Sequence, residues 1–343
     1  MPVRRGVSAA AVVAAVVAAG VGARAQAEDP AVTVTAITPA RPHAGTPLTV
    51  DVTSRTGDEA RVCLLPAAGT SRCAEAVPQE DGTRRATFTA PHPGRWTLVV
   101  DAGAERVTRR LRILPHGDRL VVLATGDSLV DNLAHGLAGR LRLRRDVALK
   151  RSVHLGAGLS RPDGFDWLAE AQASVARWQP DVVVVFLGGN EGYDLDGVPC
   201  CAANWVERFA DRQRALIRAY AGDGRTRVYW TTLPAPSPDS EARRIVWAAE
   251  NLALEAATAG GEARVFDVKA LLTPRYRWRR SMRWNGRRRV VRDPDGVHLN
   301  RTGGRVAAWA LLKQLREDGV DVPARGSRPG HGHNVPRSTR TRP

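Results

Sequence analysis

The sequence predicts a small all-β domain followed by a larger α/β domain. The chain has 343 residues, more than one small hydrophobic core usually organises, so two domains are expected. From residue 31 to residue 114, short β-prone runs alternate with turn residues. After Asp118, continuous apolar runs alternate with amphipathic helical stretches, which is typical of parallel sheets covered by helices. The segment from Pro115 to Asp118 therefore separates a domain at 28–115 from one at 118–320.

The first 27 residues are predicted to be a secretory signal peptide. Arg4 and Arg5 precede an Ala- and Val-rich run from Ser8 to Val21, and small residues allow cleavage near Ala27. An uncleaved membrane anchor is the alternative, but the run is short for a spanning helix. No later stretch is long and apolar enough to span a bilayer, so the mature chain is expected to be secreted or associated with the cell envelope.

The net charge of +16 suggests an anionic partner. Nucleic acid is not expected, because an exported protein rarely meets it, and an anionic envelope surface is the better candidate. Nearly all the basic residues are Arg, a bias that also fits genomic composition. Residues 321–343 combine Arg, Pro, Gly, Ser and His without apolar periodicity, so this tail is predicted to be disordered.

Four cysteines in an exported chain favour disulfides over a metal site. Cys63 and Cys73 flank a loop rich in Ala, Gly and Ser, and their spacing predicts a disulfide that staples a hairpin. Cys200 and Cys201 are adjacent. They allow a vicinal disulfide, two thiols or bonds to other cysteines, and the sequence does not decide among these.

Six strands are predicted in the first domain. Alternation of apolar and polar residues at 33–37 and 48–52 is typical of strands with one solvated face, and together the runs favour an immunoglobulin-like β-sandwich. The predicted strands are Ala31–Thr38, Pro47–Ser54, Ala60–Leu65, Arg84–Ala90, Arg95–Asp101 and Glu105–Leu114.

The second domain is predicted to hold a parallel sheet with helices on both faces, and ligands of such sheets bind beyond the carboxyl ends of the strands. The predicted strands are Leu120–Ala124, Val182–Leu187, Val228–Thr232 and Val265–Val268. The predicted helices are Asp131–Arg144, Trp167–Arg177, Trp205–Tyr220, Glu241–Ala257 and Gly303–Glu317.

Two short motifs supply the groups of a nucleophilic site. Gly126-Asp127-Ser128-Leu129 directly follows the first apolar run, so Ser128 is expected on a tight turn between a strand and a helix. Asp295-Gly296-Val297-His298-Leu299 precedes the last helix, and one turn can aim its carboxylate at the imidazole. An imidazole between a carboxylate and a hydroxyl activates the hydroxyl as a nucleophile. Helix capping by Asp127 or Ser128 is the alternative interpretation of the first motif.

Residues 119–317 resemble the SGNH/GDSL hydrolases, a family defined by Ser, Gly, Asn and His in four separated blocks. The two motifs above match its Ser and His blocks, and Gly188-Gly189-Asn190 matches its Asn block. The Gly block is the loosest match and lies at 154–160, where Gly158 is favoured over Gly156. Glu191 departs from the family pattern, since many members have Asp after the Asn, and this puts a neighbouring hydrogen bond in doubt.

The resemblance implies a three-layer αβα sandwich of the flavodoxin-like type around a five-stranded parallel sheet. It also implies acyl transfer through an acyl-enzyme, with Ser128 as the nucleophile, His298 as the base and Asp295 orienting the imidazole. The backbone amides of Ser128 and Gly158 and the side chain of Asn190 would form the oxyanion hole. No metal or organic cofactor is implied.

A basic and aromatic segment runs from Arg275 to Arg292. Cations interleaved with Tyr276, Trp278 and Trp284 suit an anionic envelope polymer, with a solvated loop as the structural alternative.

The expected function is that of an exported serine esterase that removes acetyl or another short acyl group from a polysaccharide. O-acyl transfer to cell-wall glycan and lipid ester hydrolysis use the same chemistry. An inactive envelope glycan-binding protein is the alternative from a different class.

Overall fold

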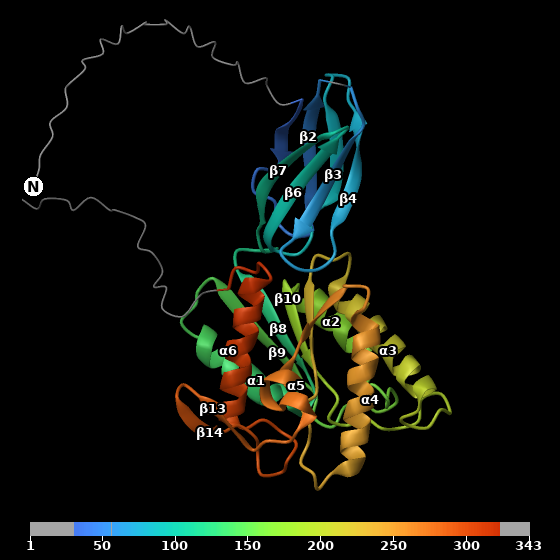
Figure 1. Cartoon of the computed structure of the whole chain (residues 1–343), viewed down its shortest axis with the longest axis vertical. Helices are drawn as coiled ribbons and strands as arrows, with labels where there is room; N and C mark the ends of the chain where they lie inside the picture. Colours follow the sequence, from blue (N-terminus) through green and yellow to red (C-terminus); the bar gives the residue numbers. More distant parts are fainter. Residues whose placement is uncertain (1–30, 56, 323–343) are drawn as a thin grey trace, which may run out of the picture.

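A computed structural model describes residues 31–55 and 57–322 of the chain. They form an all-β part and an α/β part, each with its own hydrophobic core (Figure 1). The predicted signal peptide lies outside the described residues, and so does the predicted disordered tail at 321–343 except for its first two residues. Among those residues, no helix combines the length and hydropathy that are needed to cross a bilayer.

The all-β part is a seven-stranded antiparallel sheet in the order β1-β2-β5-β4-β3-β6-β7. The strands are β1 Val32–Thr38, β2 Pro47–Ser54, β3 Ala60–Pro66, β4 Arg72–Pro78, β5 Arg84–Thr89, β6 Gly94–Ala102 and β7 Glu105–Ile113. This confirms an all-β domain. The strands join into one curved sheet, so the immunoglobulin-like sandwich is supported only in part. The sequence does not predict β4, because most of its side chains are exposed or half-buried and leave no clear apolar face.

Both cysteine pairs form disulfides. Cys63 on β3 lies directly opposite Cys73 on β4, and their disulfide confirms the predicted staple. Cys200 is bonded to Cys201, which is one of the alternatives that the sequence leaves open.

The α/β part is built on five parallel strands in the order β12-β11-β10-β8-β9. The strands are β8 Leu120–Gly126, β9 Val147–Val153, β10 Val182–Phe186, β11 Arg227–Thr231 and β12 Ala263–Phe266. The main helices are α1 Ser128–Leu141, α2 Trp167–Trp178, α3 Ala203–Ala221, α4 Glu241–Thr258 and α6 Arg301–Glu317. The helices α1 and α6 cover one face and α2, α3 and α4 the other, which confirms the α/β class and the five-stranded parallel sheet (Figure 1).

Several elements of this part differ from the sequence prediction. The edge strand β9 was missed because it contains Lys150 and Arg151 and is largely half-buried. The helix α1 begins at Ser128, three residues earlier than expected. The short helix α5 (Val268–Leu272) and the turn η1 (Pro274–Tyr276) lead into a hairpin of β13 (Ser281–Trp284) and β14 (Arg287–Val290).

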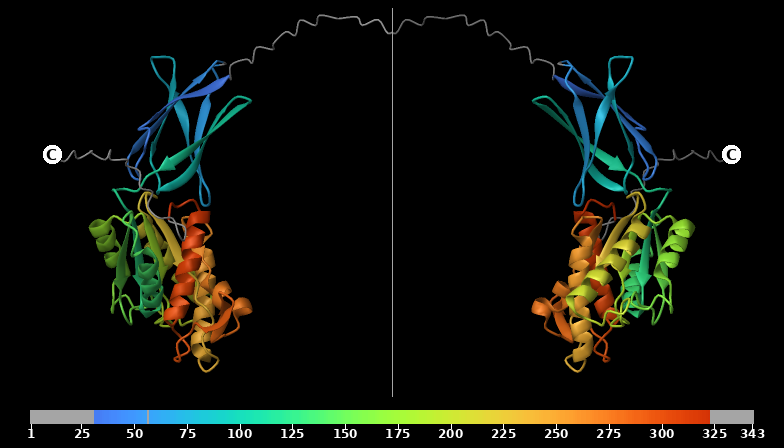
Figure 2. Two further views of the ribbon diagram at one scale, coloured as in Figure 1. Left: turned by 90° about the vertical axis from the view of Figure 1, so that its left-hand side faces the viewer. Right: turned by 90° about the vertical axis from the view of Figure 1, so that its right-hand side faces the viewer.

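The all-β part packs against the amino ends of the parallel strands (Figure 2). The Arg95 amide donates to the Gly319 carbonyl over 2.9 Å, and the Arg72 guanidinium donates to the Asp223 carbonyl over 2.7 Å. The linker is held as well, since the His116 amide donates to the Asp181 carboxylate over 2.9 Å. This arrangement leaves the carboxyl ends of the strands uncovered by the all-β part.

Candidate active site

Ser128 lies where β8 passes into α1. Gly126 ends the strand with φ +149°, and a Cβ atom there would lie 2.0 Å from the Phe186 carbonyl oxygen, so only glycine fits. Asp127 caps the helix by accepting from the Leu129 amide over 2.8 Å. Ser128 is therefore the first residue of α1, in the helical turn whose amides lack intrahelical acceptors. The capping interpretation holds for Asp127 and leaves the Ser128 hydroxyl available.

His298 and Asp295 lie in the loop before α6. One oxygen of Asp295 accepts from the Val297 and His298 amides over 2.8 and 3.0 Å, which fixes the loop. Its other oxygen lies 2.5 Å from His298 Nδ1, and His298 Nε2 lies 2.7 Å from Ser128 Oγ. The fold thus connects a hydroxyl, an imidazole and a carboxylate in series across 170 residues of sequence.

The Asp295 carboxylate is held in its ionised form. Burial would raise its pKa, but the hydrogen bond with the His298 ring and those from the two amides outweigh burial and lower the pKa. An ionised Asp295 favours the tautomer that carries its proton on Nδ1 and leaves Nε2 free to accept a proton.

The second oxygen of Asp127 connects the serine to the asparagine motif. It accepts from the amides of Gly189 and Gly188 over 2.6 and 3.1 Å, and from Asn190 Nδ2 over 3.3 Å. Burial raises the Asp127 pKa to about 6, although the amides act in the opposite direction, so the carboxylate is ionised at neutral pH. The motif suggested only a cap for Asp127, because its other partners lie some sixty residues away.

Glu191 connects the glycine and asparagine motifs. Its carboxylate, on a half-buried residue, accepts from the amides of Leu159 and Ser160 over 2.6 and 2.7 Å, and from the Ser160 hydroxyl over 2.6 Å. Burial raises the Glu191 pKa to about 6 against these hydrogen bonds. Glu191 stands where many SGNH/GDSL hydrolases have Asp, and in this structure it joins the two motifs through these hydrogen bonds.

Gly158, favoured over Gly156 from the sequence, lies against the asparagine motif. A Cβ atom on Gly158 would lie 2.8 Å from the Asn190 carbonyl oxygen, whereas one on Gly156 would meet nothing within 4 Å. Asn190 Nδ2 also donates to the Ala157 carbonyl over 3.2 Å. The structure thus brings Asn190 beside Gly158, and Asp127 joins Asn190 to the start of α1.

The helix α4 supports the asparagine motif from behind. Arg243 donates to the Gly189 carbonyl and the Trp247 ring to the Gly188 carbonyl, each over 2.8 Å. Glu250 is buried on the same helix, and burial, followed by repulsion from Glu191 and Asp127, raises its pKa well above its ordinary value. These surroundings favour the neutral form of Glu250.

Arg292 anchors the histidine loop from inside the protein. Its side chain is fully buried and donates to the carbonyls of Val297 over 2.8 Å and Ala235 over 3.0 Å, with longer bonds to those of Gly296 and His298. Its guanidinium carbon lies 4.4 Å from the centre of the Trp278 ring. Burial lowers its pKa to about 10, so it remains charged at neutral pH.

The predicted polymer-binding segment from Arg275 to Arg292 is therefore wrong at its last residue, because Arg292 is buried. Arg292 faces the interior rather than solvent, and Trp284 packs edge-on against Trp309 with ring centres 4.9 Å apart. Arg283 and the arginines at 287–289 are exposed, so a polymer-binding role for them stays a prediction. In sequence, Arg292 cannot be told from these exposed neighbours, which is why its role was missed.

Replacing Arg292 by Met is expected to lower both stability and activity. Several buried carbonyls would lose their donor, and each costs about 1–3 kcal/mol, so the free energy of unfolding should fall by at least about 3 kcal/mol. Displacement of His298 should also lower kcat by about a hundredfold. Urea unfolding and ester hydrolysis measure the two effects. The matched control is Arg289→Met on exposed β14, and an equal loss in both variants would contradict this role for Arg292.

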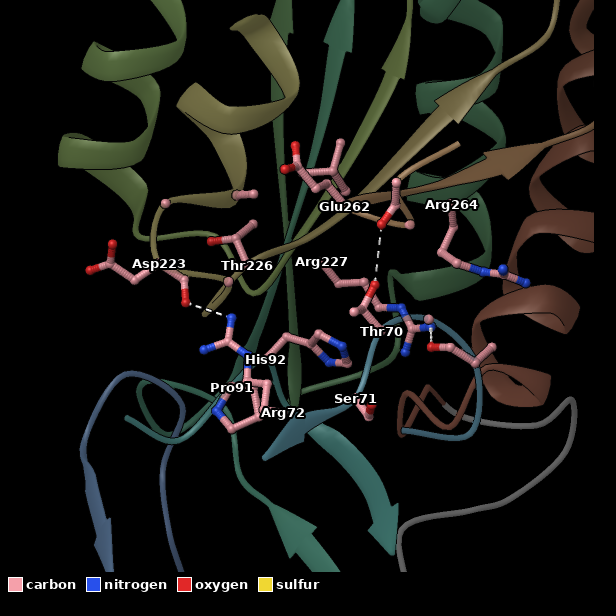
Figure 3. A pocket seen from close by; sticks show the side chains of 18 of the residues that line it. Thr70, Ser71, Arg72, Pro91, His92, Asp223, Thr226, Arg227, Glu262 and Arg264 are labelled. Atoms are coloured by element: carbon pink, nitrogen blue, oxygen red, sulfur yellow. Dashed lines mark hydrogen bonds between the residues drawn. The ribbon is translucent and has the colours of Figure 1, made fainter. Parts of the chain in front are cut away.

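A separate cavity of about 690 Å³ lies at the opposite, amino end of the sheet, between the two parts of the chain (Figure 3). Arg72, Arg227 and Arg264 line it together with Asp223 and Glu262, so its charges are mixed. Neither Ser128 nor the residues around it line this cavity. Within residues 31–55 and 57–322, no cluster of three or more His, Cys, Asp or Glu side chains is placed to hold a metal ion.

Comparison with known proteins places most of the α/β part in a family. Residues 121–314 match the family described as "Protein of unknown function (DUF459)". No curated protein matches the chain.

Several solved structures are similar to more than half of the chain. The acetyl xylan esterase AlAXEase is 17% identical, with 57% of this chain and 99% of that chain covered and a TM-score of 0.39. The catalytic domain of peptidoglycan O-acetyltransferase A from Streptococcus pneumoniae is 16% identical, with 59% and 96% covered and a TM-score of 0.38. A lipolytic G-D-S-L family protein from Veillonella parvula is 14% identical, with 57% and 98% covered and a TM-score of 0.39.

Proposed function

The chain belongs to the DUF459 family, and we propose that it is a serine-dependent ester hydrolase that acts through an acyl-enzyme. The segment that matches the family contains Ser128, Asp295 and His298. The observation that carries the proposal is the 2.7 Å contact between Ser128 Oγ and His298 Nε2, continued by the 2.5 Å contact between His298 Nδ1 and Asp295. This connectivity is the one by which a serine hydroxyl becomes a nucleophile.

The first half of the reaction acylates the serine. His298 Nε2 takes the hydroxyl proton while Ser128 Oγ attacks the ester carbonyl carbon, and the carbonyl oxygen becomes an oxyanion. As the tetrahedral intermediate collapses, the bond to the alcohol oxygen breaks and the imidazolium returns the proton to that oxygen. The alcohol leaves, and the acyl group stays on Ser128.

The second half releases the acyl group. His298 removes a proton from water, the resulting hydroxide attacks the acyl carbon, and the proton returns to Ser128 Oγ as the acid departs. Entry of a sugar hydroxyl in place of water would transfer the acyl group instead. Ionised Asp295 stabilises the imidazolium in both halves.

The oxyanion is proposed to bind the backbone amides of Ser128 and Gly158 and the side-chain amide of Asn190. The Ser128 amide lies at a helix start, where the helix dipole favours negative charge. The Asn190 amide makes only long bonds of 3.2 and 3.3 Å to its present acceptors, and such bonds can shorten or exchange when charge develops nearby. Removing one donor of this kind typically costs a hundredfold or more in rate.

The proposed substrate is a polysaccharide that carries acetyl or another short acyl group. The side chains of His298 and Asp295 are 32% and 44% exposed, so the reacting groups lie at an open surface that a polymer can reach. A long acyl chain would need an extended apolar channel beside the serine to bury it. The predicted signal peptide, if cleaved near Ala27, would place the enzyme outside the cytoplasm, where such polymers occur.

The proposal is tested with p-nitrophenyl esters of increasing acyl length and, in parallel, with acetylated xylan and O-acetylated peptidoglycan. We expect kcat/KM to be highest for acetyl and free acetate to appear from at least one glycan. Preference for long acyl chains, without acetate release, would contradict the polysaccharide substrate and favour a lipid ester. Acetate that appears on an added oligosaccharide instead of in solution would identify a transferase.

A further inference from the structure

Two loops leave the proposed oxyanion hole and carry an arginine and a tyrosine toward the same place. Residues 158–166 connect Gly158 to α2, and residues 190–202 connect Asn190 to α3. Arg161 and Tyr193 are each three residues beyond the oxyanion-hole residue of their loop. Because three residues span at most about 11 Å, the Cα atoms of Arg161 and Tyr193 lie within about that distance of those of Gly158 and Asn190.

Arg161 and Tyr193 form a stacked pair at the surface. The Arg161 guanidinium carbon lies 4.7 Å from the centre of the Tyr193 ring, and its Nη1 donates to the Tyr193 hydroxyl over 3.3 Å. Tyr193 is 48% exposed and Arg161 is exposed as well. The pair therefore presents an aromatic surface, a phenol and guanidinium donors to solvent beside the proposed oxyanion hole.

The loops that carry this pair are held from below. The Glu191 carboxylate joins them through the amides of Leu159 and Ser160. Arg212 on α3 donates to the Leu159 carbonyl over 2.8 Å and to the Asp196 carboxylate over 3.2 Å, which ties each loop to the same helix. The Trp205 ring also donates to the Tyr193 carbonyl over 2.8 Å. The loop backbones that carry the pair are thus held in place, which lowers the entropic cost of ordering these loops on binding.

We propose that Arg161 and Tyr193 form a sugar-binding subsite that holds the acylated glycan beside Ser128. The apolar face of a sugar ring would pack on the Tyr193 ring, while the phenol and the Arg161 guanidinium would bind its hydroxyl or acidic groups. An exposed pair with this many donors suits a saccharide better than a hydrocarbon chain. This inference rests on the proposed function, because it assigns the polymer that the esterase would act upon.

The test compares a glycan ester with a small ester in the same variants. In Tyr193→Ala and Arg161→Ala, kcat/KM for an acetylated xylo-oligosaccharide should fall by about tenfold, mainly through KM. A tenfold change corresponds to about 1.4 kcal/mol, which is the size of one such contact. Hydrolysis of p-nitrophenyl acetate should change less than about twofold. Tyr193→Phe should keep most of the glycan activity because it keeps the ring. Arg177→Ala is the matched control, since Arg177 stacks 5.2 Å from the Trp178 ring at the far end of α2.

A binding measurement separates the subsite from the chemistry. In the Ser128→Ala background, calorimetry with the same oligosaccharide should show weaker binding when Tyr193 or Arg161 is also replaced. Unchanged glycan binding and kcat/KM would overturn the subsite while Ser128-dependent ester hydrolysis persists. Equal losses on the glycan and on p-nitrophenyl acetate would also overturn it, because they indicate that the pair only holds the loops. Absence of any Ser128-dependent hydrolysis would instead overturn the proposed function, and the subsite with it.

Discussion

Ser128→Ala is expected to lower kcat for p-nitrophenyl acetate by on the order of 10⁴-fold or more. The variant loses the atom that would form the acyl-enzyme, while the oxyanion-hole donors remain and support a small residual rate. The fold should persist, because alanine is favourable at a helix start and Asp127 still caps α1. The free energy of unfolding should therefore change by less than about 0.5 kcal/mol.

The matched control is Ser71→Ala, an exposed serine in the hairpin between β3 and β4. Its kcat should equal that of the unmodified protein. Steady-state rates are compared at equal concentrations of folded protein, checked by circular dichroism. If Ser128→Ala hydrolyses the ester as fast as Ser71→Ala does, Ser128 is not the nucleophile.

Asn190→Ala should have the second largest effect, a loss of about 10²–10³-fold in kcat. The side-chain amide is proposed to donate to the oxyanion, which exists only during the reaction, so KM should change little. The two long bonds that Asn190 makes to Asp127 and Ala157 would also be lost. Their loss should lower the free energy of unfolding by about 1 kcal/mol.

Asn190→Asp separates hydrogen-bond donation from packing, because the carboxylate has nearly the same shape but carries no N–H donor. It should lose at least as much kcat as Asn190→Ala. Asn204→Ala, an exposed asparagine at the start of α3, is the control and should keep full activity. A rise in KM with unchanged kcat in both Asn190 variants would assign Asn190 to substrate binding instead.

The sequence predicted the parts of the fold whose signals are local. The runs at 120–124 and 182–187 were identifiable because β8 and β10 lie inside the sheet and are buried on both faces. The strand β9 lies at the edge and keeps polar residues, so its pattern resembles that of a loop. The seven strands of the all-β part form one sheet because strands distant in sequence pair with one another. No single segment of the sequence reveals this pairing.

In the candidate site too, the residues with local signals were predicted and those with distant partners were not. Ser128, Asp295 and His298 were predicted because each lies in a short motif with its local partner. The roles of Asp127 and Glu191 in joining separate motifs, and that of Arg292 in anchoring the histidine loop, were not predicted, because most of their partners are backbone groups that the fold brings close. A charged residue beside such a motif is therefore a candidate for a supporting role, but only the structure shows that Asp127 and Arg292 are buried and well partnered.

Covalent labelling of the unmodified protein with a sulfonyl fluoride, followed by mass spectrometry of the intact chain and its peptides, shows directly whether Ser128 is the nucleophile. Attack by an activated serine displaces fluoride and leaves one sulfonyl group on the oxygen. We expect a single adduct, on Ser128, formed in step with the loss of esterase activity and formed more slowly in His298→Ala. Complete loss of activity with Ser128 unlabelled, or an adduct on another side chain, would contradict the assignment of Ser128 as the nucleophile.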